Sequence, residues 1–598
     1  MSDTERVAER PAATLDTEWA CSGTSSIELA NVFPLPLMRA PPGRGRRATR
    51  RLRHARECNE TLEGLNWFAG FMPNQPAENS FPCNAFQEKV WARVDQLVYE
   101  MGPPSETPSS QAAFQELLRG RSVYGIGADG GLSLATFRSP SQVSMSDDVA
   151  SVPSVLDLVP DSDHYFGQGM QRMLRTCDDY KELCEKLGPV KVYTDRKLLA
   201  SREKYLSLIR RLVESGLFRL LLEEDAIEQV SIFFVIKKGK ALVRLVIDAR
   251  ASNRHFVAPP GVSLCSTEGM SRIEVQLPEH IPLDSPAGLR IIEQLLLSLG
   301  VADVADAFHR MRIPKALSRY FCLPAVSADE LGLSDTFLDG VLLRPGTLLV
   351  PAAGSLPMGF SWSLFFCQQV TEKNMKVPSQ MTSVPLLRDR AVAPVFDAVA
   401  CQQPGSEPRA GCVTKVGYVY VDNLGILGAF EDEVAGDLGD VCAVLDNAGL
   451  TTHERAVTSE PALTLGAVVD GGRLRSHASL ARLWKVRRAF TWALRCRRLP
   501  GRVWEALLGH ATFLGLADRG SLAAFSSIYG FIHAHYWDPC PLWRSARTEV
   551  RHFLALLPLL VSDWTLQWCS NVVASDASLS GFGVCVGAWT AREAGTVG

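Results

Sequence analysis

The stretch Val416-Gly-Tyr-Val-Tyr-Val-Asp-Asn-Leu-Gly-Ile-Leu427 places a polar pair, Asp422-Asn423, between two short apolar runs. Runs rich in Val, Tyr, Ile and Leu favour β-strands, and a short polar break between them predicts a hairpin with Asp422 at its turn. A second carboxylate, Asp303, follows the apolar run Leu295–Gly300. Two strand-end carboxylates that meet in one sheet would suit a divalent metal ion.

Five further stretches, together with this hairpin, form an ordered set along the chain. They are Phe233-Phe-Val-Ile-Lys-Lys-Gly-Lys240, Arg244-Leu-Val-Ile-Asp-Ala-Arg-Ala-Ser-Asn253, Asp303-Val-Ala-Asp-Ala-Phe308, Leu356-Pro-Met-Gly-Phe-Ser-Trp-Ser363 and Leu465-Gly466. In this order, and with Tyr420–Asn423, they resemble the fingers, palm and primer-grip motifs of retroelement reverse transcriptases. One block would be weak evidence, because aspartates are common in hairpin turns. The ordered set extends over about residues 190–540 and makes the resemblance specific.

The resemblance implies an α+β fold, a right-hand polymerase with fingers, palm and thumb. It divides the chain into a disordered basic tail (1–57), a helical segment with a Ser/Pro/Gly-rich linker (58–160), fingers and palm (161–475), a thumb-like helical region (476–545) and an incomplete RNase H-like segment (546–598).

Apolar periodicity predicts the main elements within this frame. Strands are expected over 230–236 and 242–247, and helices over 195–218, 432–448 and from 480 onward. In the last of these, Leu483, Val486, Phe490 and Ala493 fall on one apolar face. Residues 103–160 are predicted to be a linker and residues 377–415 an inserted loop, because both are rich in turn-forming residues.

The resemblance assigns catalysis to Asp303, Asp422 and Asn423. It implies two Mg²⁺ ions, or Mn²⁺ in their place, held by Asp303, Asp422 and the backbone carbonyl of Val304. Two such ions can stabilise both the attacking and the leaving oxygen of a phosphoryl displacement. Asn423 departs from the family pattern, in which many members carry a second aspartate. Asp306, three residues after Asp303 on an expected strand, is interpreted as structural.

Nucleotide binding is implied for a second group of residues. Lys238 and Arg244 align with the fingers pair that holds a triphosphate, chemistry that suits a point charge and a bidentate guanidinium. Phe308 occupies the position of a ring that excludes a ribose 2′-hydroxyl. Met358 replaces the glutamine found in many viral members, and Gly359 allows close backbone approach.

The predicted function is an RNA-directed DNA polymerase that extends a primer on an RNA or DNA template with deoxynucleoside triphosphates. The alternative is a catalytically degenerate remnant that binds nucleic acid without synthesis, which Asn423 and Met358 favour. An RNA-dependent RNA polymerase is a further rival, and Phe308 argues against it.

The distribution of charge predicts that local basic patches, and not the net charge of the chain, contact nucleic acid. The chain has 598 residues and a net charge of −3, so no overall field attracts nucleic acid. Basic residues gather at 43–56 and again at 482–502, where no acidic residue intervenes. By the resemblance, Arg482, Lys485, Arg488 and Arg495 would contact backbone phosphates on a thumb helix.

A last block, Val572–Val586, resembles the opening strands of an RNase H-like domain and would make Asp576 a metal-binding carboxylate. Its position after the thumb favours retrotransposons of the LTR type or the tyrosine-recombinase type. Glu593 is the one acidic residue that follows Asp576, so we expect no RNase H activity.

Cysteine usage and hydropathy suggest an intracellular protein. The 15 cysteines form no C-x-x-C pair and no Cys/His cluster at zinc spacing. No secretory signal is visible, and no apolar run reaches the roughly 20 residues that span a bilayer. We therefore expect a cytoplasmic or nuclear protein without membrane partners.

Overall fold

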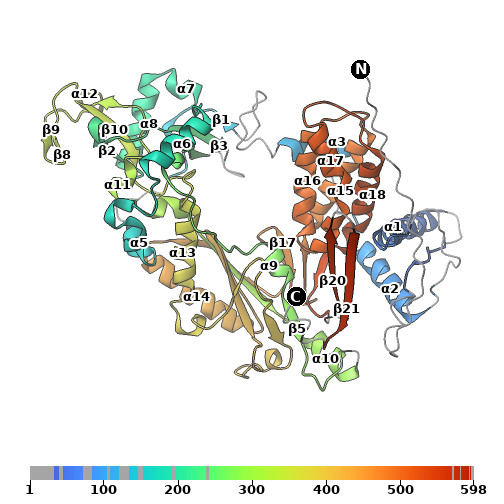
Figure 1. Ribbon diagram of the computed structural model, residues 1–598. Helices are drawn as coiled ribbons and strands as arrows, with labels where there is room; N and C mark the ends of the chain where they lie inside the picture. Colours follow the sequence, from blue (N-terminus) through green and yellow to red (C-terminus); the bar gives the residue numbers. More distant parts are fainter. Residues whose placement is uncertain are drawn as a thin grey trace, which may run out of the picture. The chain divides into compact units, whose positions relative to one another are not determined.

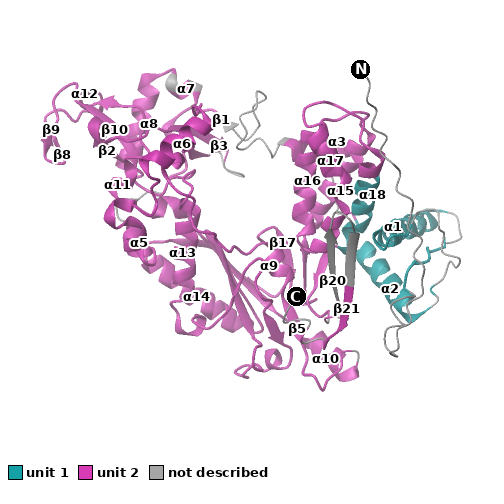
Figure 2. Ribbon diagram, in the orientation of Figure 1, with its two compact units in different colours: residues 1–102, 548–559 teal, residues 103–547, 560–598 magenta. Residues whose placement is uncertain are grey.

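The computed structural model describes residues 32–39, 45–71, 82, 84–103, 108–119, 134–145, 152–191, 193, 195–236, 242–283, 285–566, 568, 571–578, 581–590 and 593. The chain divides into two compact units (Figure 2). Unit 1 contains residues 1–102 and 548–559, and unit 2 contains residues 103–547 and 560–598. Each unit is described by itself below.

Unit 1 is built on two helices, α1 (Arg46–Phe68) and α2 (Ala85–Glu100). Asn84 caps α2 by accepting a hydrogen bond from the backbone N–H of Gln87. The helices bury an apolar core that includes Leu35, Leu62 and Val94. The basic run predicted to be disordered is therefore helical from Arg46, because this stretch leads directly into the packed face of α1.

The central sheet of unit 2 has the strand order β11-β13-β14-β6-β15. Its strands are β11 (Leu386–Leu387), β13 (Lys415–Tyr420), β14 (Asn423–Gly428), β6 (Ser298–Val304) and β15 (Thr452–Thr458). All neighbours are antiparallel except β11, which is parallel to β13. The predicted hairpin is β13–β14.

Helices α13 (Ser363–Met375) and α14 (Glu431–Asn447) pack on one face of this sheet (Figure 1). Ala302 and Val304 of β6 belong to the core on that face, whereas Leu299 and Val301 pack in a different core on the opposite face. Side chains alternate along a strand, so Asp303 shares the face of Leu299 and Val301. The helix predicted over 432–448 corresponds to α14.

Unit 2 also contains two smaller, three-stranded sheets. The first has the order β1 (Leu134–Ala135), β3 (Ser231–Ile236), β4 (Val243–Asp248), and the second β2 (Phe218–Leu222), β10 (Leu348–Ala353), β7 (Val326–Ser327). The strands predicted over 230–236 and 242–247 are β3 and β4. The helix predicted over 195–218 is split into α7 (Arg196–Leu199) and α8 (Arg202–Glu214), because Ser201 caps α8.

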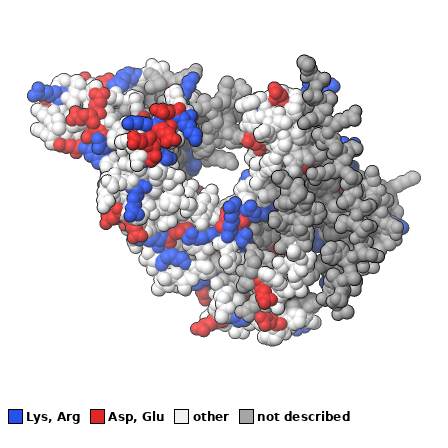
Figure 3. All heavy atoms as spheres, viewed as in Figure 1, with Lys and Arg blue, Asp and Glu red and all other residues white. Residues whose placement is uncertain are grey.

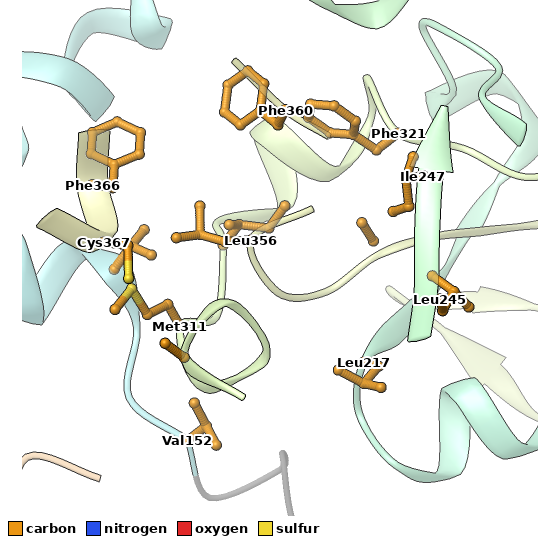
Figure 4. Packing of buried hydrophobic residues seen from close by; sticks show 14 of the residues in the cluster. Val152, Leu217, Leu245, Ile247, Met311, Phe321, Leu356, Phe360, Phe366 and Cys367 are labelled. Atoms are coloured by element: carbon orange, nitrogen blue, oxygen red, sulfur yellow. The ribbon is translucent and has the colours of Figure 1, made fainter. Parts of the chain in front are cut away.

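A continuous apolar core joins these sheets to α13. Figure 4 shows Leu245 and Ile247 of β4 in the same cluster as Leu356, Phe360 and Phe366. The loop that carries Leu356–Ser363 is therefore anchored by burial at Leu356 and Phe360.

Residues 480–556 are mainly helical, with α15 (Leu480–Arg495), α16 (Gly501–Gly515) and α17 (Ser527–Ala534), followed by α18 (Arg544–Leu556) at the unit boundary. The predicted apolar face of α15 is confirmed, since Leu483, Val486, Phe490 and Ala493 are all buried. A sheet of β16 (Ala462–Thr464), β17 (Ala467–Asp470), β18 (Arg475–Ala478) and β19 (Val561–Asp563) accompanies the helices. The final hairpin is β20 (Asn571–Ser578) with β21 (Gly581–Ala588).

Two predicted irregular segments are structured instead. Within residues 103–160, α3 (Ser110–Arg119) packs on α15, and β1 extends the sheet of β3 and β4. Within 377–415, β11 joins the central sheet and β12 (Val395–Asp397) pairs with β5 (Glu274–Gln276). Short strands completed by distant partners carry little periodicity of their own, so local patterns did not reveal them.

The remaining helices and strands are short: α4 (Val155–Leu158), α5 (Ser162–Phe166), α6 (Cys177–Leu187), α9 (Thr267–Ser271), α10 (Pro286–Gln294), α11 (Lys315–Ser318), α12 (Ala328–Leu331), β8 (Phe337–Leu338) and β9 (Val341–Leu342). The class is thus mixed α+β. Among the described helices, none combines the length and apolar character needed to cross a membrane.

Candidate active site

The hairpin turn between β13 and β14 meets the end of β6. Tyr420 pairs with Asn423, which leaves Val421 and Asp422 as the two turn residues, and Asn423 pairs in turn with Asp303. The backbone N–H of Val304 donates to the carbonyl of Asp422 at 2.9 Å. The register therefore brings Asp303 and Asp422 to one end of the sheet.

The turn is held in a strained conformation. Val421 has a φ of 60°, which is costly for a β-branched residue. Its buried backbone is fixed from α13, where Gln368 Oε1 accepts from the Val421 N–H at 2.7 Å and Thr371 Oγ1 donates to the Val421 carbonyl at 2.8 Å. Both α13 side chains are fully buried. Helix α13 thus sets the position of Asp422.

We expect Gln368→Met to destabilise the protein by about 1–3 kcal/mol, because it keeps a similar side-chain volume but leaves the buried Val421 N–H without an acceptor. Denaturant unfolding measures this loss. Asn374→Met, on the same helix, is a comparison in which the lost side-chain bond goes only to a carbonyl of α13 itself, Val370, at 2.8 Å. Equal losses in the two variants would contradict a special role for Gln368 at the turn.

Asp303 combines a raised pKa with a buried carboxylate oxygen. Burial, with the adjacent charge of Asp422, raises the pKa of Asp303 to about 6, against a lowering contribution from His453. Its Oδ1 is buried and has no hydrogen-bond partner among the described residues. A buried carboxylate oxygen without a partner, beside a second carboxylate, is a donor set that fits a hard divalent cation.

His453 is a site residue that sequence reasoning missed. Its Nε2 lies 3.0 Å from Asp303 Oδ2, because His453 of β15 pairs with Asp303 of β6 just before a register shift to Ala456. The histidine side chain is 44% exposed and that of Asp303 is 25% exposed, so the pair can be reached from solvent. No local motif marks His453, since its position depends on the register of β15.

Asn423, the departure from the family pattern, points at its neighbour. Its Nδ2 donates to Asp422 Oδ1 at 3.1 Å. The amide therefore occupies one oxygen of a carboxylate that the resemblance assigns to metal binding.

The predicted nucleotide-binding residues are spread over several elements. Lys238 lies outside the described residues. Arg244 is exposed on β4, where it pairs with Val235. Phe308 lies half-buried in a short 3₁₀ helix, not on a strand, and packs against the main core. Strand β6 ends at Val304, and Asp306 has a φ of 48°, so strand alternation does not apply to it.

Met358 and Gly359 lie against β4. The Met358 carbonyl accepts from the Ile247 N–H at 3.1 Å. Gly359 has a φ of 123°, and a β-carbon there would come within 2.3 Å of the Ile247 carbonyl oxygen. Asn253 braces the same loop by donating to the Gly359 carbonyl at 2.9 Å and accepting from the Ser361 N–H at 3.0 Å.

The four predicted phosphate-contacting residues of α15 have unequal surroundings. Arg482 is partly buried with its guanidinium 3.5 Å from the centre of the Phe513 ring, and burial lowers its pKa. Lys485 forms an ion pair with Glu116 of α3. Arg488 Nε is buried without a described partner, and Arg495 is exposed. On the face drawn in Figure 3, basic and acidic side chains are interspersed.

The last predicted site residue is in β20. Asp576 pairs with Gly583 of β21, as expected for a strand-turn-strand block. The structure does not describe its side chain.

Similarity to known proteins is found among solved structures only. No protein-family model matches the chain. No curated protein matches it either. Among solved structures, the chain is similar to the foamy viral protease-reverse transcriptase in complex with double-stranded DNA, at 14% identity and a TM-score of 0.40, over 87% of this chain and 70% of that one. A likeness at this TM-score carries no argument about function.

Proposed function

We propose that this chain is an RNA-directed DNA polymerase of a retroelement, related to LTR-type or tyrosine-recombinase-type retrotransposons. The observation that carries the proposal is the buried, unpartnered Oδ1 of Asp303 beside Asp422. The ordered sequence motifs support it, because the two carboxylates belong to separate motifs and meet at one sheet end.

Asp303, Asp422 and the Val304 carbonyl would hold two divalent ions, Mg²⁺ or Mn²⁺. When bound, such ions offset charge on the attacking and leaving oxygens of a phosphoryl transfer. The protein's own contribution is positional. Gln368 and Thr371 fix the turn that carries Asp422, and the β6–β14 register fixes Asp303 against it.

The other predicted roles belong to the same proposal. Lys238 and Arg244 bind the triphosphate, Phe308 selects deoxynucleotides, and Met358 with Gly359 lies beside the nucleotide. Arg495, which is exposed, contacts the phosphates of a primed template most readily, whereas Arg482, Lys485 and Arg488 do so less strongly because each has an intramolecular partner. Asp576 is the first metal-binding carboxylate of an RNase H-like segment.

A second candidate function is nucleic-acid binding without synthesis. The hydrogen bond from Asn423 to Asp422 favours it, because the amide competes with a cation for the same carboxylate oxygen. In this case the fold and the basic residues persist while the chemistry is lost.

Primer extension on a primed RNA template separates the two functions, with Mg²⁺ and Mn²⁺ assayed in parallel. We expect DNA synthesis by the wild type, its loss in Asp422→Asn, and faster synthesis in Asn423→Asp. If the wild type shows no DNA synthesis and Asn423→Asp does, the chain is a recently disabled enzyme. If neither the wild type nor either variant synthesises DNA but all three still bind duplex, the chain is a nucleic-acid-binding protein without polymerase activity.

A further inference from the structure

Helices α1 and α2 of unit 1 bring together three different metal-ligating side chains. His54 and Cys58 are four residues apart on α1 and so share a helix face, and Asp95 comes from α2. One ligand atom from each lies within 4.8 Å of the other two. His54 Nε2 is 2.8 Å from Asp95 Oδ1 and 3.6 Å from Cys58 Sγ.

The three donors differ in their access to solvent. Cys58 is completely buried in the core of unit 1, together with Leu62 and Val94. The side chain of His54 is 30% exposed and that of Asp95 is 59% exposed. The sulfur therefore lies on the inner side of the cluster and the carboxylate on its solvent side, which leaves a route for a small ion to enter.

We propose that His54, Cys58 and Asp95 form a binding site for a divalent cation of the Zn²⁺ type, which cross-links α1 to α2. Thiolate, imidazole and carboxylate are the donors that zinc takes in proteins. At bond lengths of about 2.3 Å to sulfur and about 2.0 Å to nitrogen, donors around a tetrahedral ion lie roughly 3.5 Å apart. The distance between His54 and Cys58 already has this value, and the fourth position is left for water.

Binding exchanges a proton for the metal. The S–H bond of Cys58 breaks, its proton passes to solvent, and a sulfur–metal bond forms, with no change of oxidation state. Burial, with the charges of Asp95 and Glu57, raises the pKa of Cys58 to about 12 in the metal-free protein. A cation offsets the negative charges of Asp95 and Glu57, so these two charges, which disfavour the bare thiolate, favour a metal-bound one.

A Cys–His–Asp catalytic relay is the competing chemistry, and the geometry opposes it. In a relay, the base uses one ring nitrogen toward the nucleophile and the other toward the carboxylate. Here the sulfur and the carboxylate both approach Nε2 of His54. The raised pKa of Cys58 also opposes a nucleophilic role. No local sequence motif marks the cluster, since His54 and Asp95 are 41 positions apart.

The test is a titration of the full-length protein with Co²⁺ after chelation, followed by displacement with Zn²⁺. We expect one equivalent of Co²⁺ to produce thiolate-to-cobalt charge-transfer absorption that Zn²⁺ removes. Cys58→Ser should abolish the absorption, and Asp95→Asn should weaken Co²⁺ binding by about 10- to 100-fold or more. Cys177→Ser, which alters an exposed cysteine of α6 in unit 2, is the matched control and should change neither quantity.

Three results would overturn the proposal: no Co²⁺ absorption in the wild type, absorption that survives in Cys58→Ser, or unchanged affinity in Asp95→Asn. If Cys58→Ser fails to fold, Asp95→Asn decides the matter, because this exposed position tolerates an amide of equal size. The absorption reports a thiolate ligand, so the outcome is independent of whether the candidate active site of unit 2 synthesises DNA.

Discussion

Replacing Asp303 by asparagine should strongly slow the DNA synthesis of the proposed function and at the same time stabilise the metal-free protein. Loss of one half of the carboxylate pair should lower the rate of synthesis by about 100- to 1,000-fold or more, as for other groups that stabilise charge in a transition state. The gain in stability has a separate cause, the ionisation of Asp303 itself.

The direction of the stability effect follows from linkage. The pKa of Asp303 is raised from 3.8 to about 6 on folding, so the folded state holds this proton more tightly than the unfolded chain does. Relative to a side chain that stays neutral, Asp303 therefore carries no penalty below pH 3.8, and a penalty that grows as pH rises and reaches up to about 3 kcal/mol above about pH 6. Asparagine carries no charge at any of these pH values and removes the penalty.

Thermal unfolding in the presence of a chelator measures this effect, at pH 7.5 and again at about pH 4. The difference between wild type and Asp303→Asn should be large at the higher pH and small at the lower one. A variant that is less stable than wild type at both pH values would show that Asp303 is an ordinary structural residue. Glu293→Gln, on the helix α10, is a control for carboxylate removal as such, because the Glu293 side chain is exposed.

A methyl group added at Gly359 should be the most damaging small substitution near the site. Gly359→Ala would place its β-carbon 2.3 Å from the Ile247 carbonyl oxygen, and the backbone φ of 123° is itself unfavourable for alanine. The loop must move, which disturbs the hydrogen bond between Ile247 and Met358 and the bracing by Asn253. We expect a loss of about 3 kcal/mol or more in the free energy of unfolding.

Gly436→Ala provides the matched control for this prediction. Gly436 is inside α14, and a β-carbon there would meet no atom within 4 Å. Alanine should stabilise the helix at this position by about 0.5–1 kcal/mol. Denaturant unfolding of the two variants should therefore give changes of opposite sign, and a neutral Gly359→Ala would show that the loop is less tightly packed against β4 than the structure indicates.

The sequence predicted the elements whose signal is local. Alternation of apolar residues located β13, β14, β3 and β4, and a 3.6-residue period located α14 and the buried face of α15. The meeting of Asp303 and Asp422 was expected from the resemblance, and the structure brings the two residues together.

What the sequence did not predict depends on distant partners. His453 reaches Asp303 only because β15 pairs with β6 in one particular register. Nothing in the sequence distinguishes Gln368 and Thr371 from other helix residues. Their role depends on the fold, which brings α13 to the backbone of Val421. Residues 110–119 carry a helical pattern of only three turns, and nothing local indicates that α15 is their partner.

The packing of α3 on α15 has a consequence for how the chain reaches its native state during synthesis. Glu116 and Lys485, which pair across these helices, are separated by 369 positions, and in unit 1 Thr61 bonds to the carbonyl of Ala555 across 494. A ribosome adds about 5–20 residues per second, so both early segments wait tens of seconds for their partners. Until then the apolar side of α3 has no partner helix to cover it. A molecular chaperone that binds this apolar surface would protect the nascent chain during that interval.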